Sequence, residues 1–238
     1  MQEQATMETP LNNDVTAAQP QGVPAGPVTF ALSRDVVVKS LPQSPTAESI
    51  HALRTHLVAR HIQEGRRGIA ICETEEAGGT FTAVNLAISL AESGVRTLLM
   101  DTNLREPELE HYIQPSHQLP GLADAIEQPD VPIGFAMQNV MPNLSLLYAG
   151  APRESSLELL GSAKFARIMD LCMREFDFTI ATTAPSNRFA DGRRVASVMR
   201  YALVVARKDV TFTSDVNTLI QELISDQVNV IGTIYKGF

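Results

Sequence analysis

Short runs of apolar residues alternate along the chain with longer stretches in which apolar residues recur every three or four positions. The run at 68–72 has no polar interruption, which is typical of a strand buried on both faces of a sheet. It is followed by Ala83, Leu86, Ala87 and Leu90, which share one face of a helix. The same patterns predict strands at 97–100, 144–149, 178–181, 202–206 and 228–234, and helices at 155–175, 188–200 and 214–226. This alternation predicts an α/β fold, with a doubly wound, mostly parallel sheet flanked by helices.

The beginning of the chain has a different composition. Residues 1–28 contain four prolines and neither lysine nor arginine, and such a segment buries too little apolar surface to offset the entropy of ordering it. We therefore expect a disordered tail at 1–28 and a single α/β domain at 29–238. Within the domain, the three valines at 36–38 are interpreted as a short extended piece, and Ser44-Pro45 is interpreted as the start of a helix.

The charge balance narrows the possible partners. The chain has 238 residues, with 19 Lys and Arg against 27 Asp and Glu, a formal charge of −8. This acidic balance argues against broad binding to nucleic acid. No apolar run is long enough for a membrane span, and the N-terminus lacks the pattern of a secretory signal, so direct membrane insertion is not expected. These features predict a cytoplasmic protein.

The cysteines and histidines predict neither a disulfide nor a metal site. Cys72 and Cys172 are too few for a disulfide framework and are most simply core residues. His51, His56 and His61 are spaced five apart, off the i, i+4 face of a paired metal site. No metal is predicted.

The segment 69–87 has the layout of a phosphate-binding loop. A buried strand is followed by a loop that contains Gly78, Gly79 and the hydroxyl residue Thr80, and then by a helix. In sheets of this kind, ligands bind beyond the carboxyl ends of the strands. A plain strand-to-helix turn with Thr80 as N-cap is the alternative.

Several motifs, in this order, resemble a known family. Asn85-Leu86-Ala87 and the segment 94–107, which contains Asp101-Thr102-Asn103-Leu104-Arg105, are similar to the ParA/MinD-type P-loop group. More narrowly, they resemble the cytoplasmic domain of bacterial tyrosine kinases of exopolysaccharide and capsule assembly. The resemblance implies a P-loop NTPase-like fold, with Gly78, Gly79, Thr80 and Asp101 as its vestigial nucleotide-binding residues. It also implies that Glu48, His51 and Arg54 form an oligomerisation face, for which a solvated helix face is the alternative.

The departures from the family pattern concern the phosphate chemistry. Gly79 stands at the position of the phosphate-binding lysine, and the second acid of the strand-end motif is Asn103. Thr182-Thr183-Ala184-Pro185 replaces a motif that begins with the Mg²⁺-organising acid, and the C-terminal tyrosine cluster is absent. Of the four lysines, the nearest in sequence, Lys39, precedes Gly79 by forty positions. Glu73, Glu75 and Glu76 instead place three carboxylates in or beside the loop.

These departures predict weak or absent nucleotide binding and no phosphotransfer, because both depend on neutralising phosphate charge. The first hypothesis is therefore a non-catalytic, kinase-like protein without a cofactor. It would associate with a membrane polysaccharide chain-length regulator (a co-polymerase), as a homo- or hetero-oligomer at the inner face of the cytoplasmic membrane. The second is an active ATPase or tyrosine autokinase in which Thr80 and Asp101 hold Mg²⁺ and Arg105, or an arginine in trans, replaces the lysine. The third is a ParA/MinD-like positioning ATPase.

Overall fold

The computed structural model describes residues 27–128 and 133–237, and the segment 1–26 of the expected tail lies outside the described residues. A seven-stranded sheet has the order β5-β6-β3-β7-β2-β8-β9 and is parallel except for β5, which pairs antiparallel with β6. A two-stranded antiparallel sheet joins β1 to β4. The strands are β1 (Phe30–Leu32), β2 (Gly68–Glu73), β3 (Thr97–Asp101), β4 (Ile113–Pro115), β5 (Met137–Met141), β6 (Leu144–Leu147), β7 (Phe178–Thr182), β8 (Tyr201–Arg207) and β9 (Asn229–Lys236).

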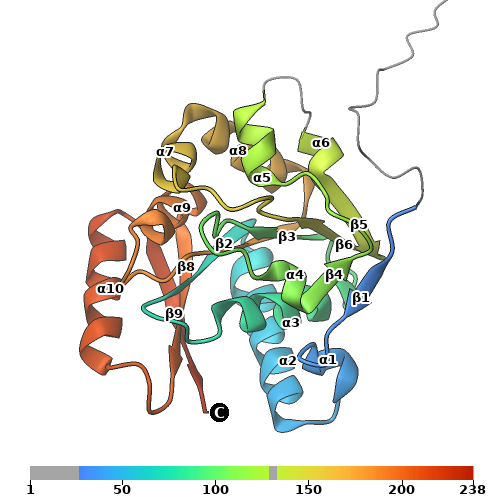
Figure 1. Ribbon diagram of the computed structural model, residues 1–238. Coiled ribbons are helices and arrows are strands. Elements are labelled where there is room, and N and C mark those ends of the chain that lie inside the picture. Colours follow the sequence, from blue (N-terminus) through green and yellow to red (C-terminus); the bar gives the residue numbers. More distant parts are fainter. Residues whose placement is uncertain (1–26, 129–132, 238) are drawn as a thin grey trace, which may run out of the picture.

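Helices cover both faces of the seven-stranded sheet (Figure 1). On one face, α2 and α3 pack over Ile69, Ile71 and Leu99; on the other, α8 and α9 pack over Ala70 and Cys72. Alternate residues of β2 enter opposite cores, as expected for a strand buried on both faces. The helices are α1 (Val37–Ser40), α2 (Pro45–Leu57), a π-helical turn η1 (Val58–Ile62), α3 (Gly79–Glu92), α4 (Leu109–Tyr112), α5 (Leu122–Glu127), α6 (Ile133–Ala136), α7 (Ser156–Gly161), α8 (Ala163–Glu175), α9 (Asp191–Met199) and α10 (Thr213–Ser225).

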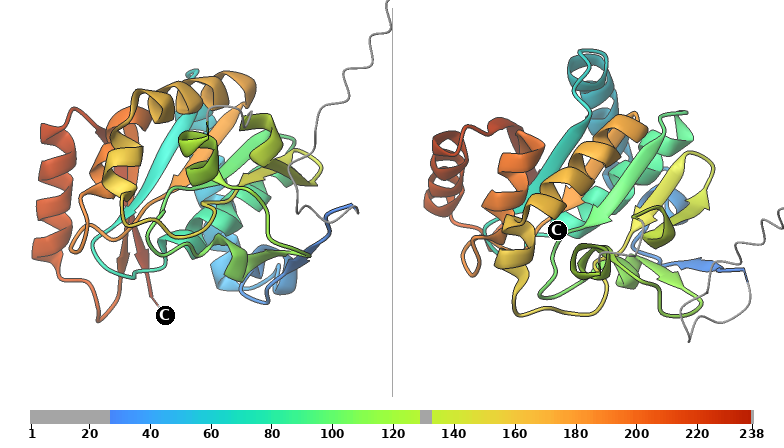
Figure 2. Two further views of the ribbon diagram at one scale, coloured as in Figure 1. Left: turned by 45° about the horizontal axis from the view of Figure 1, so that its top comes forward. Right: turned by 90° about the horizontal axis from the view of Figure 1, so that it is seen from above.

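This architecture confirms the expected α/β fold class. Ser44 begins α2 as expected, because its hydroxyl accepts a hydrogen bond from the Ala47 amide at 3.2 Å. The helix expected at 155–175 is divided into α7 and α8 by Ser162, whose hydroxyl caps α8. At the edge of the sheet, α10 lies beside β9 (Figure 2).

One local prediction is wrong. The valines at 36–38 do not form an extended piece: Val37–Ser40 is a helical turn, α1. The cause is a tertiary contact, because the Asn85 side chain on α3 accepts a hydrogen bond from the Val38 amide at 3.1 Å and donates one to the Asp35 carbonyl. Within 27–128 and 133–237, none of the helices has the length and apolar character needed to cross a membrane.

Candidate functional site

The loop between β2 and α3 is closed by a carboxylate of the chain itself. Glu73 ends β2, and its Oε2 atom accepts hydrogen bonds from the amides of Ala77 at 2.8 Å and Gly79 at 2.9 Å. Gly78 precedes the helix in the left-handed region, with φ at +93°, a conformation that glycine adopts without steric cost. The amides that begin a helix of this kind form a ready anion site, and here Glu73 supplies the anion.

The Glu73 carboxyl lies in an unusual electrostatic environment. It is only 5% exposed, and burial raises its pKa to about 7, against the opposing effect of the loop amides. In this arrangement, a nucleotide phosphate and the Glu73 carboxylate cannot both occupy the amides of Ala77 and Gly79. The loop as it stands therefore does not fit a nucleotide. The other two glutamates lie outside the loop's interior: Glu75 is half-buried and Glu76 is exposed.

Thr80 does not cap the helix. The helix begins at Gly79 with Gly78 as its N-cap, so the alternative of Thr80 as N-cap is wrong. Thr80 lies in the first turn and is 6% exposed. The structure thus brings Gly78, Gly79 and Thr80 into one loop and first turn, as the sequence predicts, but the capping carboxylate comes from Glu73.

A lysine does lie beside the loop, although sequence distance argued against one. Lys236 ends β9, and its Nζ atom lies close against Gly78. If Gly78 carried a side chain, its Cβ atom would be only 2.8 Å from that Nζ. The same Nζ lies 4.2 Å from the centre of the Phe81 ring. Partial burial lowers the pKa of Lys236, and the nearby Glu73 carboxylate opposes that shift. The parallel pairing of β9 with β8 carries this residue to the loop, and local sequence contains no signal for that pairing.

The Asp101 carboxylate is held by hydrogen bonds within the chain and is not free to bind a metal ion. Its Oδ1 accepts hydrogen bonds from the Asn103 amide at 3.0 Å and the Thr182 hydroxyl at 2.9 Å, and its Oδ2 accepts from the amides of Glu108 at 3.0 Å and Leu109 at 3.1 Å. The side chain is 1% exposed, and burial raises its pKa while these hydrogen bonds lower it. Four donors already use the lone pairs that a Mg²⁺ ion would need.

Arg105, the candidate substitute for the missing lysine, is engaged elsewhere. Its Nε donates to the Asp191 carboxylate at 2.7 Å, and its guanidinium lies 4.5 Å from the centre of the Phe189 ring. Arg188 stacks on the same ring and pairs with Glu106 at 2.8 Å. Both arginines therefore hold the loops at the carboxyl ends of the strands together.

The predicted oligomerisation residues lie on α2, next to α3. Glu48 is exposed, whereas His51 and Arg54 are half-buried. His51 Nδ1 lies 2.8 Å from the Ser89 hydroxyl, and an Arg54 Nη1 atom donates to the same oxygen at 3.2 Å. Much of this face is therefore used inside the chain, and its role between chains stays a prediction.

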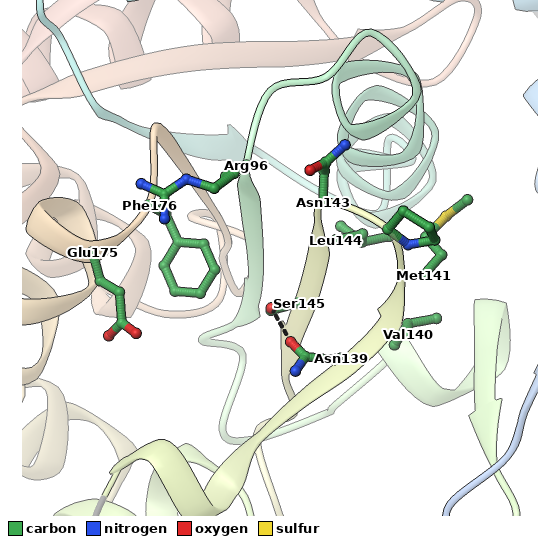
Figure 3. Close-up of a pocket in the computed structure, with 10 residues that line it drawn as sticks. Arg96, Asn139, Val140, Met141, Asn143, Leu144, Ser145, Glu175 and Phe176 are labelled. Carbon is green, nitrogen blue, oxygen red and sulfur yellow. Dashed lines mark hydrogen bonds between the residues drawn. The ribbon is translucent and has the colours of Figure 1, made fainter.

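A cavity of about 540 Å³ opens at the opposite end of the sheet (Figure 3). It lies where β3 and β6 begin, between Arg96, the β5–β6 hairpin and Phe176. Its polar groups are partly paired: Arg96 binds Asp177 at 3.3 Å and Ser145 donates to Asn139 at 2.7 Å. In the described ranges, no cluster of three His, Cys, Asp or Glu side chains could hold a metal ion.

Comparison with known proteins finds relatives among the bacterial tyrosine kinases. No family model matches the chain. The chain is 25% identical over 180 residues to a "Putative tyrosine-protein kinase CapB" of Staphylococcus aureus, which covers 75% of this chain and 78% of the relative. It is 25% identical over 203 residues to the "Putative tyrosine-protein kinase EpsB" of Ralstonia solanacearum, but spans only 27% of that protein.

Solved structures show the same fold. The chimerical protein CapA2B2 superposes with a TM-score of 0.77 at 20% identity, over 86% of this chain and 90% of that chain. The kinase domain of the Escherichia coli tyrosine kinase ETK gives a TM-score of 0.76 at 22% identity, over 85% of this chain and 79% of that one. The chain has the fold of these kinase domains and is similar in sequence to bacterial tyrosine kinases.

Proposed function

We propose that this kinase-like chain does not bind nucleotide and supports capsule or exopolysaccharide synthesis as a non-catalytic protein. The observation that carries the proposal is the Glu73 carboxylate on the amides of Ala77 and Gly79. A phosphate group would have to displace that carboxyl group, and above about pH 7, where the group is ionised, it would also meet its charge. Two unit charges about 4 Å apart repel by roughly 4 kcal/mol at an effective dielectric constant near 20.

The pathway is inferred from the relatives. One of them, 30% identical over 169 residues, is the "Succinoglycan biosynthesis transport protein ExoP" of Rhizobium meliloti, of which this chain spans 21%. In keeping with the transport role in the name of this relative, we propose that the partner of this chain is a membrane polysaccharide chain-length regulator. Docking on that partner would place the chain at the inner face of the cytoplasmic membrane. Glu48, His51 and Arg54 on α2 are the proposed face between subunits.

Nucleotide binding is tested by thermal unfolding. A ligand present at one hundred times its dissociation constant stabilises a protein by about 2.7 kcal/mol. The proposal predicts that about 1 mM ATP with Mg²⁺ leaves the melting temperature unchanged and that labelled ATP transfers no label to the protein. An upward shift that Thr80→Ala abolishes would contradict the proposal.

Lys236 supports a second candidate, an active autokinase or ATPase with an atypical loop. Its ammonium group lies beside Gly78 and could supply the charge of the missing lysine if Glu73 withdrew. Under this alternative, Lys236→Met would abolish labelling by ATP, whereas Lys208→Met would leave it unchanged. A protein that remains unlabelled before and after both changes favours the non-catalytic proposal.

A further inference from the structure

A second cavity lies near the amino ends of the strands. The β2–α3 loop lies at the opposite, carboxyl ends of the strands. The cavity has a volume of about 310 Å³, at the lower end of the range for small-molecule sites. Arg60 and His61 come to its wall from η1, Arg66 from the following loop and Ile231 from β9. His56, near the end of α2, also lines it.

The π-helical turn explains how two histidines five residues apart line one cavity. The Gln63 amide donates to the Val58 carbonyl at 3.1 Å, the i→i+5 hydrogen bond of a π-helix. An α-helix repeats every 3.6 residues and would turn His56 and His61 toward different sides. The wider turn places both beside the cavity. Turns of this kind occur frequently at functional sites.

One ring nitrogen of His61 is buried without a hydrogen-bond partner among the described residues. The side chain is 2% exposed, and its Nδ1 atom has no hydrogen-bond partner within the described part of the chain. Its ring packs edge-on against Phe178 and Tyr201, and its Nε2 is 3.5 Å from the Gly68 carbonyl. Burial lowers the pKa of His61. Buried polar atoms in native proteins are nearly always paired, and His61 is one of the residues that line the cavity, so a ligand bound there could complete its hydrogen bonds.

The charges around the cavity indicate the chemistry of that ligand. Arg60 is exposed, and its guanidinium has no partner among the residues that the structure describes. Arg66 lies 5.2 Å from the centre of the Tyr201 ring and pairs with Glu64, the one acidic residue of the wall, at 2.7 Å. Two guanidinium groups and the His56 imidazole offer more donors than one carboxylate can accept, and arginine forks match phosphate oxygens.

We infer that the cavity formed by His56, Arg60, His61 and Arg66 binds a phosphate group, either as free phosphate or as a small phosphomonoester. Arg60 and Arg66 supply the charge, His56 donates to a phosphate oxygen, and the open Nδ1 of His61 accepts a hydrogen bond from a P–OH group. The site is separate from the β2–α3 loop, so its occupancy is independent of the function proposed above.

The test is a titration of the full chain with inorganic phosphate, followed by the ring carbon–proton signals of His56 and His61 in NMR spectra at constant ionic strength. We expect both signals to shift saturably while the amide signals of Gly78 and Gly79 remain in place. A parallel titration with glycerol phosphate distinguishes a monoester site, which binds it more tightly, from a site for free phosphate.

Variants assign the binding to this cavity. Arg60→Gln should weaken phosphate binding at least about tenfold, the effect of losing a hydrogen bond to a charged group. Glu64→Gln should strengthen it, and the exposed Arg167→Gln on α8 should leave it unchanged. His61→Phe keeps the ring packing, so an unchanged melting temperature with weaker binding, read from His56, supports the inference. Shifts that sodium chloride or acetate reproduce, or that survive both Arg60→Gln and His61→Phe, would overturn it.

Discussion

Replacing Glu73 by glutamine should make the protein's stability less dependent on pH. Both loop amides donate to the same oxygen, Oε2, so a glutamine carbonyl can accept both hydrogen bonds while its side chain carries no charge. The variant therefore changes the titration of the site with little change in its geometry.

The size and sign of the effect follow from the pKa. Burial raises the pKa of Glu73 from 4.5 to about 7, so the folded protein holds this proton more tightly than the unfolded chain does. The stabilisation from protonation is complete below pH 4.5 and is lost as the pH rises through about 7. The rise from 4.5 to about 7 corresponds to about 3 kcal/mol, most of which is lost between pH 5 and pH 8.

The assay is urea denaturation of the wild type and of Glu73→Gln at about pH 5 and about pH 8. The difference in unfolding free energy between the two proteins should move by about 2–3 kcal/mol in favour of the variant as the pH rises. The exposed Glu76→Gln is the control and should show no such change. A difference that stays constant across this pH range would refute the reasoning, because it would mean that the Glu73 carboxyl is not buried in the loop.

The remaining predictions concern Asp101, Arg54 and Arg105. Asp101→Asn replaces an acceptor oxygen by a donor among four donors, and should lower the unfolding free energy by about 2–3 kcal/mol in urea denaturation; an unchanged stability would mean that Asp101 is free for another role. Arg54→Glu should weaken self-association about tenfold in light scattering, whereas Arg167→Glu should not; equal effects would remove α2 from the interface. Arg105→Ala leaves the buried Asp191 carboxylate unpaired and should cost about 3 kcal/mol of stability; a loss below about 0.5 kcal/mol would mean that the pair does not form in solution.

Local sequence patterns predicted the central strands because these are buried on both faces and consist almost entirely of apolar residues. The short strands β4 and β5 were not predicted, since they are partly exposed and contain polar residues such as Gln114 and Asn139. The turn at Val37–Ser40 depends on Asn85, a contact between distant segments that a local pattern does not contain.

The candidate site was predicted only in part, for the same physical reason. Gly78, Gly79 and Thr80 could be placed in a loop from their spacing, and Glu73 was one of three candidate carboxylates. Which carboxylate turns inward depends on the backbone of the loop, and only Glu73, at the end of β2, reaches the amides. Lys236 could not be predicted, because it reaches the loop only through the pairing of β9 with β8.

The most direct test of the central claim is a calorimetric titration of the full chain with ATP and Mg²⁺ at about pH 8, where the Glu73 carboxyl is ionised. Wild type and Glu73→Ala are compared. The account predicts no saturable heat for the wild type, and any binding that does arise is expected only in Glu73→Ala, in which the amides of Ala77 and Gly79 are released. Saturable binding of ATP by the wild type that Glu73→Ala leaves unchanged would contradict the claim that this carboxylate closes the loop to phosphate.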